Sequence, residues 1–231
     1  MRSVKAIFIK QAKDMTKNFS VLVMFILFPL VAFGMTEFVA RGNYDISDTM
    51  FTTMMASIFV GMALIQSACT IIAEDREKKS LRFLVIAGVK PLAYLLGIGG
   101  VIFIASLISS LAFGYIGGFD RTEFAAFMAV MMSGAVASII LGATIGIYSK
   151  NQQAATGLSM PIAVVLGFGP MVAQFNERIE SVVRIFYTQQ INVVVNDFAA
   201  GLAQTLIIIW LNIAVLTIIF ILAYSKKGLR D

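Results

Sequence analysis

The charged and polar side chains of this sequence gather most densely between residues 74 and 88. The stretch opens with Glu-Asp-Arg-Glu and then becomes amphipathic, with Leu81, Leu84 and Val85 at positions i, i+3 and i+4 of a helix. Acids in a first turn suit a helix N-terminus, and Gly88 can end the helix. We therefore expect a helix over 74–88. Its apolar stripe is too large for so short a loop to cover, so it should contact the membrane surface or another protein.

Composition excludes several kinds of chemistry. The chain has no histidine, which removes imidazole bases, Ser–His–Asp triads and histidine-ligated metals. Its single cysteine, Cys69, excludes an internal disulfide and a thiolate metal cluster. No G-x-x-x-x-G-K-[ST] phosphate-binding loop occurs, so we expect this chain neither to hydrolyse ATP itself nor to hold a cofactor.

Two polar side chains, Gln66 and Asn212, lie inside long apolar runs. Either could line a substrate path, although such residues more often bond to a neighbouring helix. No charged residue interrupts these runs, which argues against an ion-coupled carrier or an intramembrane aspartyl protease. Gly142 and Gly146 form a G-x-x-x-G pair, which favours close helix packing, within the chain rather than between copies.

The elements that hold these residues are predicted to be six membrane-spanning helices. Of 231 residues, 59% are apolar and only 13% charged, an excess that requires a second apolar phase. Each of six uncharged runs can hold one crossing, and none alternates as a barrel strand would. The runs are 19–36, 49–73, 91–119, 124–149, 151–176 and 198–225. We interpret residues 1–231 as one all-α integral membrane domain.

Charge predicts how the six helices are oriented. One side of the membrane would hold both termini, residues 74–90 and Lys150. It carries fourteen Lys and Arg against five acids, whereas the other side carries four Arg against eight acids. Because cytoplasmic loops are enriched in basic residues, we expect both termini in the cytoplasm and the chain in the cytoplasmic membrane. The net charge of +5 is then a topology signal and not a nucleic-acid-binding patch.

Two further segments are predicted to lie at the membrane surface. Residues 2–17 place apolar side chains on one arc and basic ones on the other, as an amphipathic interfacial helix does. This helix could be a simple anchor, or it could hold the first span and touch a partner. Residues 177–197 are too short to cross, so we expect either short helices dipping from the outer face before the sixth span or an amphipathic loop.

The order of these features resembles the permease subunits of type-2 ABC exporters, a family of six-helix membrane proteins. The resemblance rests on Glu-x-Arg-Glu-x-x-Ser-Leu-x-x-Leu after the second span, Pro-Leu-x-x-Tyr at the third, and the polar turn 150–154. Family members usually have Gly-Thr after the acidic-Arg-Glu run. Here Ser80 matches the threonine, and Lys79 stands at the glycine position.

The resemblance implies an exporter subunit that is not itself an enzyme. A separate cytoplasmic ATPase would bind ATP and Mg, residues 74–88 would form the coupling helix in its groove, and two permeases with two ATPases would work together. The cargo expected is amphipathic or hydrophobic, such as a peptide, drug or lipid, moved outward through the bilayer. The implied coupling residues are Glu74, Asp75, Arg76, Glu77, Ser80, Leu81, Arg82, Leu84 and Val85.

Two other functions remain open from the sequence. A non-transporting membrane scaffold or immunity protein needs no energy input and fits the same composition. A lipid-acting membrane enzyme needs a cluster of acids, His or Arg at one face, for which this chain offers only Glu177, Arg178, Glu180 and Arg184. An ATPase gene beside this one would favour the exporter over both.

Overall fold

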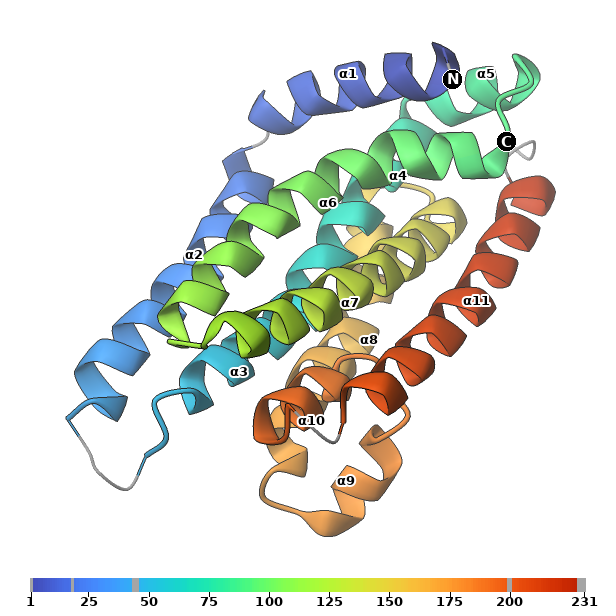
Figure 1. Cartoon of the computed structure of the whole chain (residues 1–231). Coiled ribbons are helices and arrows are strands. Elements are labelled where there is room, and N and C mark those ends of the chain that lie inside the picture. The colour runs from blue at the N-terminus through green and yellow to red at the C-terminus, as the bar shows by residue number, and fades with distance from the viewer. Residues whose placement is uncertain (1, 18, 43–45, 199–200, 228–231) are drawn as a thin grey trace.

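The computed structural model describes residues 2–17, 19–42, 46–198 and 201–227, and these ranges fold into helices joined by turns (Figure 1). Parts of two segments that we assigned to opposite sides, the loop 41–48 and the tail 226–231, lie outside the described residues. The first helix begins and the last helix ends at the same end of the bundle (Figure 1). An even number of crossings produces this arrangement.

Within the described residues, six helical segments are long and apolar enough to cross a membrane, which confirms the predicted number and indicates a multi-pass membrane protein. Three of them are single helices of 26 to 28 residues, and two others contain short π-helical stretches. In order they are α2 (Phe19–Met35) with η1 (Thr36–Ala40), α3 (Met50–Ile58) with η2 (Phe59–Leu64) and α4 (Ile65–Glu77), α6 (Pro91–Ile116), α7 (Arg121–Tyr148), α8 (Gln152–Ala173) and α11 (Leu202–Lys227).

The second span, α3–η2–α4, lies at the centre of the bundle and is the most deeply buried of the six. Glycines let the neighbouring helices approach its backbone closely. A Cβ atom added to Gly142 would overlap the carbonyl oxygen of Ile65, and one added to Gly146 would lie 2.7 Å from that of Cys69. The G-x-x-x-G pair of α7 therefore packs against α4 within the chain, as we predicted.

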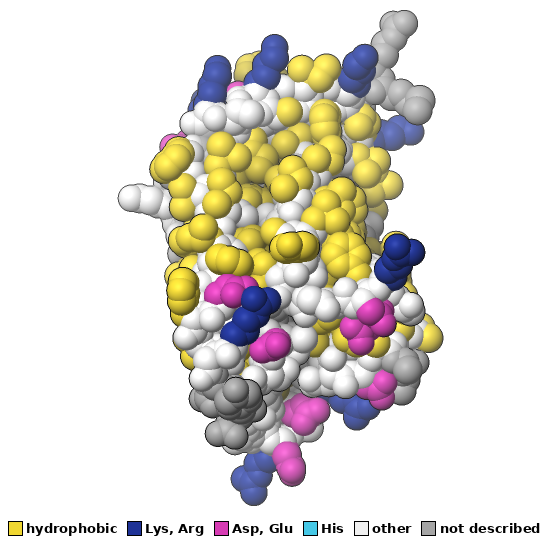
Figure 2. Space-filling model, turned by 60° about the vertical axis from the view of Figure 1, so that its left-hand side comes forward, with side chains coloured by type: hydrophobic (Ala, Val, Ile, Leu, Met, Phe, Trp, Pro, Cys, Tyr) yellow, Lys and Arg dark blue, Asp and Glu magenta, His cyan; other side chains and the backbone are white. Residues whose placement is uncertain are grey.

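The outer surface of the bundle is largely apolar. Figure 2 shows a broad belt of hydrophobic side chains, with Lys and Arg at the end that carries α1 and charges of both signs at the opposite end. Many large apolar side chains are exposed on α2, α8 and α11. Water would not tolerate so much exposed apolar surface, whereas lipid or another membrane subunit would cover it.

Four shorter helices complete the fold. At one end, here called the α5 end, α1 (Arg2–Lys17) lies across α6, and α5 (Ser80–Ile86) projects beside it (Figure 1). At the other, the α9 end, α9 (Glu177–Val183) and α10 (Gln189–Asn196) fill the segment 177–197. Ile191 and Val194 of α10 are fully buried against the bundle, whereas Ile185 between the two helices is exposed.

The apolar arc of α1 is covered by protein. Ile7 and Met15 are buried, and a Cβ atom added to Gly97 of α6 would lie 2.6 Å from the Ile7 side chain. Gln11, a polar residue of the same helix, is buried as well. The glycine at position 97 thus lets α1 rest directly on α6, with its lysines on the outer side.

Candidate functional site

Residues 74–77 form the last turn of α4 and not, as we expected, the first turn of a new helix. Because α4 runs unbroken from Ile65, these acids lie at the negative end of its dipole, where cations stabilise them. Lys78 forms an ion pair with Glu74, and the hydrogen bond to this carboxylate, together with its charge, raises the pKa of Lys78. Lys10 of α1 reaches Asp75. The segment 74–88 therefore begins as part of the second span.

The chain turns from α4 into α5 at Lys79, whose φ of 59° is left-handed. Among the described residues it is the only one other than glycine with a positive φ. A side chain in this conformation costs roughly 1–2 kcal/mol that glycine avoids. The left-handed residue falls where the permease family usually has glycine, so this chain makes a glycine-type turn with lysine.

Asp75 joins three helices at the base of this turn. Its side chain is almost fully buried, and one carboxylate oxygen lies 2.6 Å from Lys10 Nζ of α1. The other oxygen accepts a hydrogen bond from the Tyr94 hydroxyl of α6 at 3.1 Å. The ring of Tyr224 packs at 5.6 Å from that of Tyr94, and its hydroxyl donates to the Val89 carbonyl. The last turn of α4 is thereby connected to α1, α6 and α11.

Arg76 and Glu77 fasten the same turn to the connection between α7 and α8. The Arg76 guanidinium donates to the carbonyl oxygens of Ile147 and Ser149, which end α7, the latter at 3.3 Å. Glu77 Oε2 accepts from the backbone N–H of Gln152, the first residue of α8, at 3.3 Å. Both contacts satisfy backbone groups that helix ends leave unpaired. Glu77, one of the implied coupling residues, is exposed and also stabilises the start of α8.

The apolar stripe predicted for residues 74–88 points into this chain. Leu81 is only 2% exposed, and Leu84 and Val85 are half-buried against the core. The expectation that no part of the chain could cover this stripe was wrong, because α5 folds back onto the bundle directly after α4. The opposite face carries the free apolar surface, with Phe83 71% and Ile86 66% exposed.

A hollow of about 360 Å³ separates α5 from α1. Ile7 and Leu84 form part of its wall, Phe83 lies at its edge, and Ser80 and Asp75 contribute polar atoms. Arg82 is exposed on the adjoining face of α5. The nine predicted coupling residues therefore divide into two groups. Asp75, Arg76 and Glu77 bind other parts of the chain, whereas Glu74 pairs with Lys78. Part of 80–86 presents a surface.

The two predicted path residues do not share a site. Gln66 accepts a hydrogen bond from Ser159 of α8 at 3.0 Å and lines a groove of about 330 Å³ between α2, α4 and α8. Asn212 of α11 donates to the carbonyl oxygens of Ile185 and Ile208, so it holds the turn before α10. Of the two residues, Gln66 lines this groove.

Sequence analysis missed a polar cluster at the α9 end. Gln174, the residue that follows α8, donates to Asn192 of α10 at 2.8 Å, and Asn192 lies 3.5 Å from the hydroxyl of Ser57. One sequence signal could have found it, because Gln189, Asn192 and Asn196 recur with spacings of three and four residues along one helix face. No protein-family model matches the chain, and no curated protein shows significant sequence similarity to it.

Proposed function

We propose that this chain is the membrane-spanning permease subunit of an ATP-driven exporter of the type-2 ABC class, in the cytoplasmic membrane with both termini and α5 in the cytoplasm. The observation that carries the proposal is the construction of α5. It is a short helix between the second and third spans, anchored on one face by Leu81 and exposed on the other through Phe83 and Ile86.

The contacts of the last turn of α4, directly before α5, would let a displacement of α5 reach other helices. Only Lys78 and Lys79 separate it from α4, whose last turn contacts α1 and α6 through Asp75 and the α7–α8 connection through Arg76. A partner ATPase that closes on ATP and Mg would displace α5, and the displacement would reach these helices together. The energy would come from the partner, while this chain would convert it into rearranged helices.

The proposed docking surface consists of the exposed face of α5 with the hollow beside α1. Burying one large apolar side chain such as Phe83 contributes roughly 1.5–3 kcal/mol. Lys78, Lys79 and Lys90 are exposed around this surface, so a partner groove with an apolar floor and an acidic rim complements it. An ATPase of the ABC class is the occupant to which we commit.

The proposed cargo path is the groove between α2, α4 and α8. Phe28, Met24 and Met160 are among the residues of its apolar wall, and Gln66 supplies a hydrogen-bonding group. Such a groove suits an amphipathic or hydrophobic cargo, as a peptide, drug or lipid would be. It opens beside the exposed apolar faces of α2 and α8, which a second permease would cover. We further propose that α1 lies in the inner headgroup layer and that α9 and α10 dip from the outer face.

The test begins with the genes beside this one, where the proposal expects a soluble ATPase with a phosphate-binding loop. That ATPase would be co-expressed with this chain and co-purified from detergent. Phe83→Asp and Ile86→Asp should each release it, since an unpaired carboxylate would enter an apolar contact. Val182→Asp, at an exposed apolar position of the α9 end, is the matched control and should retain it. Full retention by a Phe83→Asp, Ile86→Asp double variant would overturn the proposal.

A further inference from the structure

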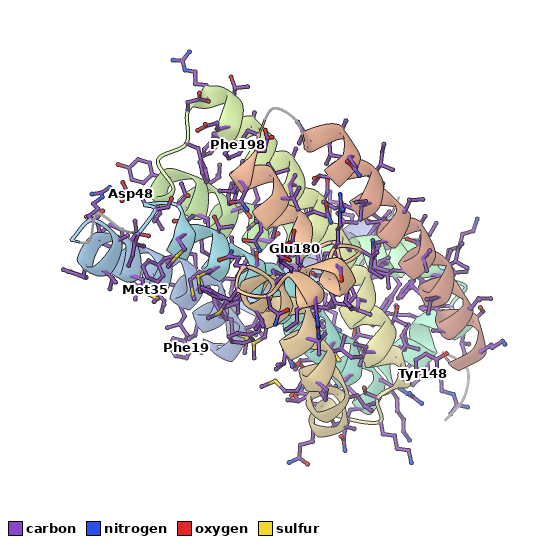
Figure 3. All side chains as sticks on the ribbon, turned by 90° about the horizontal axis from the view of Figure 1, so that it is seen from below. Phe19, Met35, Asp48, Tyr148, Glu180 and Phe198 are labelled. Carbon is purple, nitrogen blue, oxygen red and sulfur yellow. The ribbon has the colours of Figure 1, made fainter. Side chains whose placement is uncertain are left out.

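A second hollow beside α1, of about 470 Å³, lies where α1 meets the start of α2 and the last turns of α4. Phe19, which is labelled in Figure 3, begins α2 at its edge. The apolar part of the first span begins at this level and that of the second span ends there, so the hollow lies at the height of lipid headgroups. We call it the α1–α4 hollow. The lining residues that matter for its chemistry are Gln11, Asp14, Lys17, Val21, Glu74 and Lys78.

The α1–α4 hollow carries two positive and two negative side chains. Glu74 and Lys78 form an ion pair with each other. Asp14 lies 4.0 Å from Lys10, which bonds more closely to another carboxylate. Lys17 forms no ion pair within the described residues. One carboxylate and one ammonium group of α1 are therefore left to meet a ligand that itself carries both charges.

The α1–α4 hollow leads into an apolar groove. Val21 lines both the hollow and the groove between α2, α4 and α8 that is described above. Met24 and Phe28, which continue the wall of the groove, follow Val21 at intervals of about one helical turn. Charges at the headgroup level, followed by an apolar groove along the span, have the same order as a phospholipid, in which a charged headgroup is joined to acyl chains.

The balance of charges restricts the headgroup. A phosphate group can pair with Lys17, and a primary ammonium group can pair with Asp14 and donate hydrogen bonds to it. Gln11 is only 5% exposed but lines the hollow, and its amide can donate to a phosphate oxygen. A choline headgroup has no N–H donor for Asp14. An anionic headgroup without an ammonium group would meet this carboxylate with no compensating charge.

We propose that the α1–α4 hollow and the groove below it bind phosphatidylethanolamine. Lys17 holds the phosphate, Asp14 holds the ammonium group, and an acyl chain lies along Val21, Met24 and Phe28. Binding needs neither an ATPase nor transport of the lipid. Failure of the lipid to bind would therefore leave the contact of α5 with an ATPase untouched, and loss of the ATPase contact would leave the lipid site untouched.

The test is native mass spectrometry of the full chain, purified in dodecyl maltoside and titrated with dioleoyl phosphatidylethanolamine. Phosphatidylcholine with the same acyl chains is the comparison, and it should bind more weakly. Asp14→Asn should weaken binding of phosphatidylethanolamine by about three- to fivefold, as loss of an exposed ion pair does, and should leave binding of phosphatidylcholine unchanged. Lys17→Met should weaken binding of both lipids, because both carry the phosphate.

Lys13→Met is the matched control, since Lys13 is an exposed lysine of the same helix that does not line the hollow. It should bind as the wild type does. Glycerophosphoethanolamine, the same headgroup without acyl chains, should bind far more weakly than the lipid. The proposal is overturned if the wild type binds phosphatidylethanolamine no better than phosphatidylcholine, if Lys13→Met and Lys17→Met weaken binding alike, or if glycerophosphoethanolamine binds as tightly as the lipid. Stronger binding of phosphatidylglycerol than of phosphatidylethanolamine would overturn it as well.

Discussion

The hydroxyl group of Tyr94 donates a hydrogen bond to the carboxylate of Asp75 at 3.1 Å. Asp75 lies in the last turn of α4 and Tyr94 in the first turn of α6, so this bond closes the base of the segment that carries α5. Both residues are buried, whereas Phe83 in α5 is exposed. The segment therefore has a fixed base and an accessible surface, as a contact that transmits movement requires.

Tyr94→Phe should destabilise the protein by about 1–3 kcal/mol, because a buried carboxylate oxygen loses its donor while the ring keeps its packing. Asp75 would retain Lys10 on its other oxygen. The measurement is the unfolding midpoint of the purified chain in detergent. Tyr115→Phe removes the same atom from an exposed side chain and should leave the midpoint unchanged. Equal shifts for the two variants would contradict a stabilising role for the Tyr94 bond.

Gly142→Ala should destabilise the chain by roughly 1–3 kcal/mol, as overpacking of a core does. The added methyl group would meet the backbone oxygen of Ile65, which cannot rotate away as a side chain could. Gly157→Ala in α8 is the control, since an added Cβ atom there has nothing within 4 Å. Denaturant midpoints of both variants would be compared with the wild type. An unchanged midpoint for Gly142→Ala would mean that α7 and α4 are farther apart than the structure shows.

Lys79→Gly should stabilise the chain by up to about 1 kcal/mol. Glycine relieves the left-handed backbone of a cost of roughly 1–2 kcal/mol, and its greater freedom in the unfolded chain offsets part of that gain. Lys79→Ala keeps the Cβ atom and should give no such gain, which separates backbone strain from loss of the lysine charge. The measurement is the thermal unfolding midpoint of each of the two variants. Equal midpoints would contradict the strain assigned to this turn.

The number of spans could be predicted from the sequence because it depends on local properties. An uncharged run of some twenty residues has to cross the membrane wherever its neighbours lie. The ends of the helices were harder to predict. Charges mark where the apolar run stops, but α4 continues through Glu74 to Glu77 because Lys10, Tyr94 and two helix ends supply partners for these side chains. Those partners come from distant parts of the sequence.

The sequence predicted a short helix with an apolar stripe after the second span, but not the direction in which that stripe points. Helical spacing correctly puts Leu81, Leu84 and Val85 on one face, but spacing does not reveal which face the rest of the chain covers. The polar cluster at the α9 end could be predicted only in part, for a related reason. Gln189, Asn192 and Asn196 share one face of α10, but the partners of Asn192, Gln174 and Ser57, come from distant segments.

Leu81→Ala should destabilise the chain by about 2–5 kcal/mol, the usual cost of removing a buried leucine side chain. Phe83→Ala, two residues further on, should change the stability by less than about 0.5 kcal/mol because the side chain is exposed. Unfolding midpoints of the isolated chain, without any partner, provide the comparison. A larger loss of stability for Phe83→Ala than for Leu81→Ala would mean that α5 is turned the other way, with the Leu81 stripe on the outer surface.

Cysteine labelling should show the α5 end in the cytoplasm and the α9 end outside. In a Cys69→Ala background, cysteines at Arg121 and Glu177 report on the α9 end and those at Lys79 and Lys150 on the α5 end; all four positions are exposed. The excess of basic residues at the α5 end opposes its transfer across the membrane. An impermeant maleimide should therefore label only Arg121→Cys and Glu177→Cys in intact cells, and all four after permeabilisation. Labelling of Lys79→Cys in intact cells would place α5 outside, beyond reach of any cytoplasmic ATPase. That result would contradict both the proposed orientation and the proposed coupling to an ATPase.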